Sequence, residues 1–406
     1  MSRSEIGAWM GMFAFVLDNI LTNALVPLLP DLRMRLDVSI ETTGWILTAR
    51  SLTQLLHSLF VVSFVIHRLG LKGTMVLSCV LQVGTCLLTG FAENVGVFIV
   101  AQIAHGIGGS CFSTASVALI AQGGASEQGR LMALLYSGVA WGSIVGTGVG
   151  GLLYAQFGQL LLFLGIAVLM GVLGLVMFIV LGQDSVSSSS AERPSLPTPR
   201  VLLKLIRHPE IFKCMGLIAL SNFFIGGCLV LLPAKLADAF SWKSTDIGLA
   251  MTAGPFLYIL ASYSIDRLIN LLDSCWLARL SVGLSSAAFL LLLVQPVEQN
   301  IIAVIGVFSA LYAATALVQI VQPGNIAAAL HRSGLDIPQT AGAALVDVAI
   351  GCGYTSMVLT AWVRAQGGFR FAFLYAGGTG LSGLILTRRP RVSPALASVR
   401  MASEED

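Results

Sequence analysis

Long apolar stretches recur along almost the whole chain, separated by short polar segments. Each is about 20 residues long, the length that an α-helix needs to cross the hydrocarbon core of a membrane. The stretches lack the two-residue alternation of outer-membrane barrel strands, and backbone groups in lipid must be bonded internally, so we expect helices. Twelve spans are predicted, at residues 6–29, 44–66, 74–92, 95–121, 131–154, 160–182, 211–232, 247–265, 274–294, 301–323, 339–362 and 370–387.

Composition supports a multi-pass membrane protein surrounded by the lipid bilayer. Of the 406 residues, 56% are hydrophobic and 11% are charged, whereas a soluble domain carries about 25% charged residues. The net charge of +3 does not favour a nucleic-acid partner. The seven cysteines form no CxxC pair, so no metal site is predicted. P-loop and nucleophile-elbow motifs are absent from the sequence, so we expect neither an enzyme nor a cofactor.

The basic residues predict an orientation. With the N-terminus in the cytosol, 16 Lys/Arg fall on the cytosolic side and six on the other. Cytosolic loops of membrane proteins are enriched in these residues. Both termini are therefore predicted to be cytosolic, in an intracellular vesicle or in the plasma membrane.

Two related halves are expected. The serine- and proline-rich segment 183–210 is predicted to be a cytosolic linker between a first half (1–182) and a second half (211–387), and residues 388–406 form a cytosolic tail. Ser63 stands four residues before His67-Arg68, and Ser262 stands four residues before Asp266-Arg267. This repeated loop signature favours a duplicated transporter.

Three charged residues lie deep within predicted spans, namely Asp18, Arg50 and Asp347. A charged side chain at the bilayer centre costs about 2.5–3.5 kcal/mol on insertion scales. One interpretation is a structural ion pair with the remaining acid buried in its neutral form. The other, which we favour, is a solute or proton site, because acids within membranes usually face a cavity.

Polar residues share helix faces with these three. His57 lies seven residues after Arg50 and Tyr354 seven after Asp347, while Gln319 lies on the tenth span. Together they predict a polar seam along the bundle axis. For His57 and His105, a hydrogen bond between helices is favoured over a proton relay, although histidine titrates near neutral pH.

The fifth span carries glycines at every fourth position, Gly138, Gly142, Gly146 and Gly150. This spacing makes a smooth helix face that allows another helix to approach closely. Packing without chemistry is the favoured interpretation. A seal that slides during opening is the alternative.

Several stretches together resemble the major facilitator superfamily, and more closely its vesicular amine transporters and drug:proton antiporters. They are Leu17–Leu21 and Val26–Pro30 in the first span, His105–Ser110 in the fourth, Gly142–Gly151 in the fifth and Asp347–Tyr354 in the eleventh. The resemblance implies an all-α membrane protein of twelve transmembrane helices in two pseudo-symmetric six-helix halves.

The resemblance also implies roles for individual residues. Asp18 with Asn19 would meet the substrate, with Tyr258, Gln319 and Tyr354 as further contacts. Arg50 would pair with Asp347 across the halves, and these two residues with His57 would serve proton coupling and gating. Two family acids are missing, since Leu229 and Gln319 occupy their positions. Fewer acids argue against polyamine substrates, which carry several charges.

The function expected from these features is secondary active transport. The substrate would be a small organic cation resembling a monoamine, exchanged for protons by alternating access in a monomer. Burial favours the neutral form of an acid and a nearby arginine favours its charged form, so Asp347 would bind a proton when Arg50 moves away. The alternatives are a multidrug or other-solute transporter with altered or absent proton coupling, and a transporter-like receptor or scaffold.

Overall fold

The structure is a computed structural model that describes residues 3–121, 125–180, 198–271, 274–332 and 340–387. Within these ranges the chain forms helices and no strands. In chain order the elements are α1 (Arg3–Leu25), η1 (Val26–Leu28), α2 (Leu29–Leu36), α3 (Ile40–Phe60), α4 (Val62–Gly90), α5 (Val95–Ala121), α6 (Ala125–Val180), α7 (Pro199–Ile206), α8 (Pro209–Phe240), α9 (Ser244–Leu271), α10 (Ser274–Leu291), α11 (Gln295–Gln299), α12 (Ile301–Arg332), α13 (Thr340–Tyr354), α14 (Met357–Gly383) and η2 (Leu384–Thr387).

Three long helices are interrupted by a glycine with positive φ. Gly70 in α4 has φ 70°, Gly158 in α6 has φ 75° and Gly368 in α14 has φ 74°. Glycine adopts this conformation readily because it has no Cβ. Each interruption falls between two predicted spans, so α4, α6 and α14 each contain parts of two membrane crossings.

The helices account for every predicted span. Among the described residues, eight stretches are long and apolar enough to cross a membrane. Two of them, Ser137–Val180 and Ala341–Gly383, are long enough for two crossings and contain the interruptions at Gly158 and Gly368. The remaining two crossings are the shorter apolar helix α10 and helix α3, whose polar residues include Arg50. The twelve predicted spans therefore coincide with helices.

The outer surface of the bundle is apolar. Val172, Phe178 and Ile179 of α6 are 55%, 59% and 67% exposed. A soluble monomer rarely exposes large contiguous apolar patches. An apolar outer surface of this kind is what the sequence predicts for helices surrounded by lipid.

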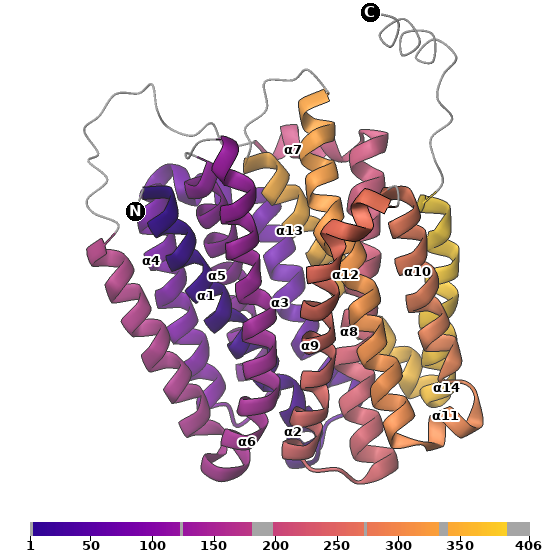
Figure 1. Ribbon diagram of the computed structural model, residues 1–406. Coiled ribbons are helices and arrows are strands. Elements are labelled where there is room, and N and C mark those ends of the chain that lie inside the picture. The colour runs from indigo at the N-terminus through magenta and orange to yellow at the C-terminus, as the bar shows by residue number, and fades with distance from the viewer. Residues whose placement is uncertain (1–2, 122–124, 181–197, 272–273, 333–339, 388–406) are drawn as a thin grey trace, which may run out of the picture.

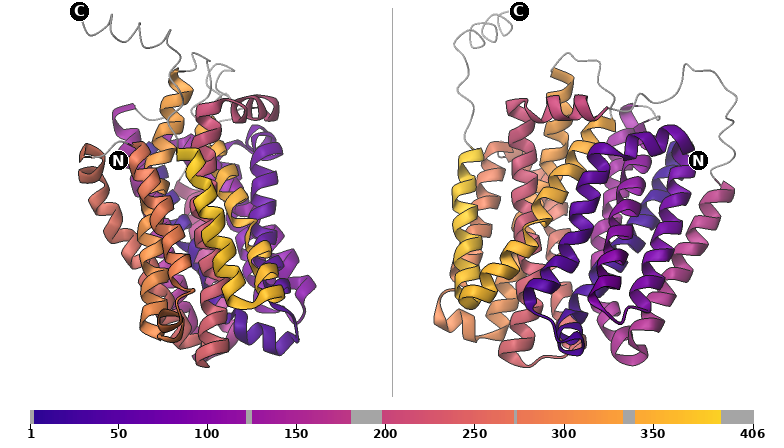
Figure 2. Two further views of the ribbon diagram at one scale, coloured as in Figure 1. Left: turned by 90° about the vertical axis from the view of Figure 1, so that its right-hand side faces the viewer. Right: turned by 180° about the vertical axis from the view of Figure 1, so that it is seen from behind.

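The helices form two bundles that lie side by side, α1 to α6 and α8 to α14 (Figure 1). Contacts between the bundles run along α6 with α9 and along α3 with α13 and α14, and the view from behind shows α3 against the C-terminal helices (Figure 2). Helix α1 begins and η2 ends at the same end of the bundle (Figure 1). Helix α7 lies within the predicted linker, so residues 199–206 of that segment are helical.

The glycine face predicted on the fifth span packs against α1. A Cβ atom added to Gly138 would lie 2.5 Å from the Met12 carbonyl oxygen, and one added to Gly146 would lie 2.8 Å from that of Ile20. Gly142 faces the Val16 carbonyl, and Gly150 faces Ala24. All four glycines thus let the backbones of α1 and α6 approach each other.

The second half contains a matching contact. A Cβ atom on Gly353 of α13 would lie 2.6 Å from the Cβ of Asn222 in α8, while one on Gly142 of α6 would lie 2.7 Å from the Cβ of Asn19 in α1. Both asparagine side chains donate to the carbonyl four residues earlier in their own helix. This pair of contacts relates the two halves more specifically than the loop signature does.

Candidate functional site

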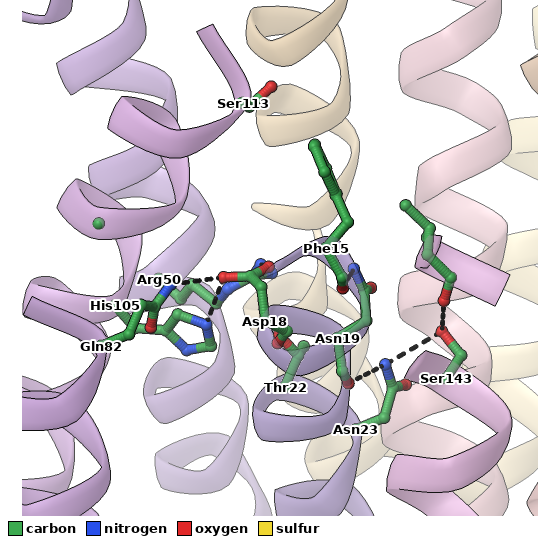
Figure 3. A network of polar contacts seen from close by, with 12 residues as sticks. Phe15, Asp18, Asn19, Thr22, Asn23, Arg50, Gln82, His105, Ser113 and Ser143 are labelled. Carbon is green, nitrogen blue, oxygen red and sulfur yellow. Dashed lines mark hydrogen bonds and ion pairs between the residues drawn. The ribbon is translucent and has the colours of Figure 1, made fainter. Parts of the chain in front are cut away.

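The carboxylate of Asp18 is the centre of a polar cluster in the first half. Its Oδ2 lies 2.9 Å from Nη2 of Arg50, and its Oδ1 accepts from Nε2 of Gln82 at 2.6 Å and lies 3.1 Å from Nε2 of His105. These four residues come from α1, α3, α4 and α5, and their side chains converge (Figure 3). Asp18 is 7% exposed. The cluster is a buried ion pair with two further hydrogen-bond partners.

Local structure places Arg50 at this depth. The hydroxyl of Ser39 accepts from the Thr42 amide at 3.2 Å and caps α3, as the sequence predicted. Arg50 then lies about 16 Å along the helix, at 1.5 Å per residue. A Cβ added to Gly109 of α5 would lie 3.5 Å from Oδ1 of Asp18. This is an ordinary contact distance, so α5 lies directly against the ion pair.

Asp347 lies apart from Arg50, so the expected Arg50–Asp347 ion pair is wrong for this conformation. Arg50 is held by Asp18, which lies in the same half. Oδ1 of Asp347 accepts from the Ser113 hydroxyl at 2.9 Å, a contact between α13 and α5. Its Oδ2 has no hydrogen-bond partner among the described residues, and Asp347 is 3% exposed. Asp347 is nevertheless within electrostatic range of both Asp18 and Arg50.

His57 is part of a separate contact. Its Nδ1 lies 2.6 Å from the Ser110 hydroxyl, which donates to the Ile107 carbonyl at 2.8 Å. Because the hydroxyl has one proton, this geometry assigns the proton of the other bond to Nδ1 of His57. The contact joins α3 to α5 as a hydrogen bond between helices. Any part of His57 in proton coupling remains a prediction.

A second polar cluster lies in the other half and is uncharged. The Tyr258 hydroxyl donates to Oε1 of Gln319 at 3.3 Å, and Nε2 of Gln319 donates to Oδ1 of Asn222 at 3.2 Å. The structure thus brings together two residues that the sequence predicted for the site. It adds Asn222, which was not predicted from the sequence. Asn222 lies 203 residues after Asn19, half the length of the chain, and that spacing between two related halves is the signal that could have pointed to it.

The other two predicted contact residues lie at helix seams. Asn19 donates from Nδ2 to the Phe15 carbonyl at 2.9 Å, and in Figure 3 it points away from the Arg50 side of α1. Tyr354 is partly buried, packs beside Gly226 of α8 and is within electrostatic range of Arg50. In this conformation, Asn19 therefore contributes to packing between α1 and α6. Tyr354 is within electrostatic range of one residue of each cluster, Arg50 and Tyr258.

Comparison with protein families identifies the family to which this chain belongs. The sequence profile of the Major Facilitator Superfamily matches residues 9–234, which is more than half of the chain. The chain belongs to the Major Facilitator Superfamily. This is a family of membrane transporters and not of enzymes, in agreement with the sequence-based expectation.

Relatives within the Major Facilitator Superfamily include vesicular transporters. The chain is 28% identical over 265 residues to the chromaffin granule amine transporter of Rattus norvegicus, covering 65% of this chain and 49% of that one. It is 26% identical to the synaptic vesicular amine transporter of Homo sapiens, covering 45% and 35%, and 25% identical to the probable vesicular acetylcholine transporter-A of Danio rerio, covering 63% and 53%. The chain spans about half the length of these relatives or less.

A solved structure supports the twelve-helix Major Facilitator Superfamily fold. The crystal structure of the human organic anion transporter MFSD10 (TETRAN) matches with a TM-score of 0.68, covering 95% of this chain and 99% of that one. The two sequences are 16% identical, so this likeness concerns the fold alone. The fold class predicted from the sequence is confirmed.

One ion pair and one hydrogen bond join the two Major Facilitator Superfamily halves at the end of the bundle opposite the N-terminus, and a second ion pair lies beside them within the second half. Arg33 of α2 lies 2.7 Å from Asp238 of α8, and Arg364 of α14 pairs with the same carboxylate. The Ser244 hydroxyl donates to Asp31 at 2.7 Å. We call these five residues the distal lock. The distal lock was not predicted from the sequence, because its five residues share no helix-face spacing. They come together only in the folded chain.

Near the distal lock, Glu298 of α11 bonds to Lys235 at 3.0 Å and to Arg370 at 3.1 Å. Burial alone would raise the pKa of Glu298, but these two cations outweigh burial and lower it. A carboxyl group with a lowered pKa stabilises the folded state above its unfolded pKa, about 4.3, and loses that contribution as the pH falls through the folded value. The stabilisation by Glu298 is therefore present at neutral pH.

Replacing Glu298 with Gln is expected to lower the thermal midpoint at pH 7, because Lys235 loses its charged partner. The difference from the wild type should shrink as the pH falls below about 4, where the wild-type carboxyl group becomes protonated. Thermal unfolding of both proteins in detergent at several pH values checks this. An equal difference at every pH would contradict the ion-pair explanation.

Proposed function

We propose that this protein is a secondary active transporter that exchanges a small organic cation, resembling a monoamine, for protons by alternating access. The observation that carries the proposal is the buried Asp18 carboxylate, which is held by Arg50 where four helices converge. A buried carboxylate is costly unless a positive charge accompanies it. An organic cation could supply that charge in place of Arg50. The names of the relatives, which include amine and acetylcholine transporters, support a cationic substrate.

Arg50 couples the two acids in this proposal. In the conformation described, Arg50 neutralises Asp18, while Asp347 has one hydroxyl donor and an unpartnered oxygen. This environment suits a protonated Asp347, because an isolated buried carboxylate would be unfavourable. When a cation displaces Arg50 from Asp18, the guanidinium becomes available to Asp347. Asp347 then releases its proton, so that one positive charge enters the site and one leaves.

The second half supplies the specificity in this proposal. Tyr258, Gln319 and Asn222 offer hydroxyl and amide groups together with an aromatic ring, and none of them carries a charge. Such a surface accepts the uncharged part of a substrate and gives no partner to a second positive charge. We therefore propose that monovalent cations are preferred over polyamines. The same uncharged cluster favours the alternative, a transporter of another solute with altered or absent proton coupling.

Alternating access would open the distal end of the bundle. There, a Cβ on Gly248 of α9 would lie 2.5 Å from the Thr147 carbonyl of α6, and one on Gly151 of α6 would lie 2.9 Å from the Ser244 carbonyl. These close contacts and the distal lock hold the halves together at that end. Opening would require α9 to leave α6 and Arg33 to leave Asp238. We propose residues 1–182 and 211–387 as the two moving halves.

We further propose that both termini face the cytosol and that the protein acts as a monomer. The distribution of the basic residues supports this orientation. In addition, α7 and both ends of the described chain lie at one end of the bundle, so they would face the same side of the membrane (Figure 1). The vesicular relatives favour an intracellular vesicle over the plasma membrane. Microscopy of the tagged full chain would distinguish these two membranes.

Uptake into liposomes tests the proposed function. Purified protein would be reconstituted and given 1-methyl-4-phenylpyridinium, a monovalent aromatic cation whose charge does not titrate, with and without an acidic interior. We expect accumulation that depends on the pH gradient, and less accumulation of spermidine. Uptake that does not depend on the pH gradient would favour the alternative function. Absence of both uptake and binding for a panel of organic cations would contradict the proposal.

Replacing Asp347 with Asn is expected to separate substrate exchange from proton coupling. The amide keeps the bond to Ser113 but cannot exchange a proton. Uptake driven by the pH gradient should fall at least tenfold, while exchange of labelled for unlabelled cation at uniform pH continues. If gradient-driven uptake survives intact in Asp347→Asn, Asp347 is not the coupling acid.

A further inference from the structure

As long as it stays ionised, the Asp18 carboxylate needs one positive partner in every state of the transport cycle, since a buried charge without a partner is strongly unfavourable. In the structure Arg50 is that partner. During the exchange proposed above, Arg50 leaves and the substrate takes its place. After the substrate departs, the empty transporter must return to its first orientation. Some other positive charge must then accompany Asp18, or Arg50 must return at once.

His105 of α5 is placed to supply that charge. Its Nε2 lies 3.1 Å from Oδ1 of Asp18, and its side chain is fully buried. The same oxygen already accepts a shorter bond, 2.6 Å long, from Gln82. His105 is therefore a second donor to an oxygen that has one. Unlike the amide of Gln82, the imidazole can also carry a full positive charge near neutral pH.

The other ring nitrogen of His105 distinguishes this residue from an ordinary structural histidine. Nδ1 is buried and has no hydrogen-bond partner among the described residues. Buried polar side-chain atoms usually have a hydrogen-bond partner. The other buried histidine in this half, His57, fits a structural donor better, because Ser110 accepts from its Nδ1. Nδ1 of His105 is thus available to gain or lose a proton when the site hydrates.

The charges around His105 determine when it can be protonated. The ionisable groups that interact with it from the helices packed on α5 are Asp18 of α1 and Arg50 of α3. Asp347 of α13 accepts from Ser113 of α5, and Cys86 of α4 is within electrostatic range of Asp18. While Arg50 occupies Asp18, a second cation beside the same carboxylate is disfavoured, so His105 is neutral. Once Arg50 has moved to Asp347, Asp18 favours the imidazolium form.

We infer that His105 is the residue through which a proton takes the place of the organic cation at Asp18. This inference rests on the proposed function and extends it to a second proton-carrying residue. In the conformation described Arg50 accompanies Asp18, and once Arg50 has moved to Asp347, Asp18 is accompanied alternately by the substrate and by protonated His105. Substrate arrival on one side expels the His105 proton to the water on that side, and substrate departure on the other side lets His105 take up a proton there. One cation therefore moves against one proton at this site without net change in its charge.

The variant that tests this inference is His105→Gln. Glutamine can still donate to Oδ1 of Asp18 but cannot hold the proton. Using 1-methyl-4-phenylpyridinium with the full-length protein in liposomes, we expect exchange at uniform pH to stay within about twofold of the wild type. Accumulation driven by the pH gradient should fall at least tenfold. The matched control is His67→Gln, which alters an exposed histidine and should behave like the wild type in both assays.

A binding measurement keeps the inference testable if the variant folds poorly. In detergent, the wild-type dissociation constant for the same cation should rise severalfold between pH 7.5 and pH 5.5, because the proton on His105 competes for Asp18. In His105→Gln this rise should be smaller. Equal affinity of the wild type at both pH values would overturn the inference.

The outcomes separate this inference from the proposed function. Gradient-driven accumulation that persists in His105→Gln overturns the role of His105 and leaves the proposed function intact. Parallel loss of exchange, binding and accumulation in a folded variant would show a positioning role only, and also overturns the inference. Failure of the wild type to take up or bind any organic cation contradicts the proposed function itself.

Discussion

Asp18→Asn is expected to abolish uptake and to destabilise the protein more than any other single polar substitution in the first half. The amide cannot balance the charge of Arg50, whose side chain is 14% exposed. Breaking one side of a buried ion pair typically costs about 3–5 kcal/mol, because the other charge is left uncompensated. The substrate also loses the carboxylate that it is proposed to bind. Thermal unfolding in detergent and liposome uptake of 1-methyl-4-phenylpyridinium measure the two effects.

A double variant separates stability from transport in this prediction. Asp18→Asn combined with Arg50→Met removes both charges and fills part of the vacated space, so it should recover much of the thermal midpoint. Uptake should remain absent, because no carboxylate is restored at the cluster. Recovery of uptake in the double variant would show that Asp18 serves the fold and not the substrate. An unchanged midpoint in the single variant would contradict the ion pair itself.

The second large effect is expected at the seam between α1 and α6. Gly142→Val should prevent normal folding or strongly reduce stability, because its side chain would meet the Val16 carbonyl and the Cβ of Asn19. Backbone atoms cannot rotate away as a side-chain end can, and overpacking a tight contact costs about 1–3 kcal/mol or more. The effect should appear as a lower yield of monodisperse protein and a lower thermal midpoint.

The matched control for the seam also lies in α6, in the crossing that follows the interruption at Gly158. Gly165 of α6 is exposed, and a Cβ added there has no heavy atom within 4 Å. Gly165→Val should therefore leave yield and midpoint close to those of the wild type. Similar losses at Gly142 and Gly165 would indicate that valine disturbs the helix itself, and the close approach of α1 would not be the cause.

Much of the architecture follows from local physical chemistry. Apolar length located the crossings, since each must bury about 20 residues in lipid. The N-cap at Ser39 placed Arg50 at mid-depth, and the spacing of the glycines predicted a helix contact. The free-energy cost of burying a charged side chain indicated Asp18, Arg50 and Asp347 as candidate site residues. These features depend on neighbouring residues in the chain, so they can be recognised without knowing how the helices are arranged.

The partners of the charged residues could not be predicted in the same way. Arg50 had two candidate acids, and the choice of Asp18 depends on how α1 and α3 lie against each other in this conformation. The contacts of His105 and Asn222 likewise depend on helices that meet only after folding. The distal lock joins Arg33 to Asp238 across 205 positions of the chain. Such contacts have no local signature in the sequence.

The pairing of Arg50 with Asp18 inside one half also has an electrical consequence. The two charges move together when that half rotates, and their sum is zero. A lone charge carried across the membrane field would gain or lose about 2.3 kcal/mol per 100 mV. The ion pair displaces almost no net charge, so in the Arg50-paired state the rotation of the first half should respond only weakly to membrane voltage.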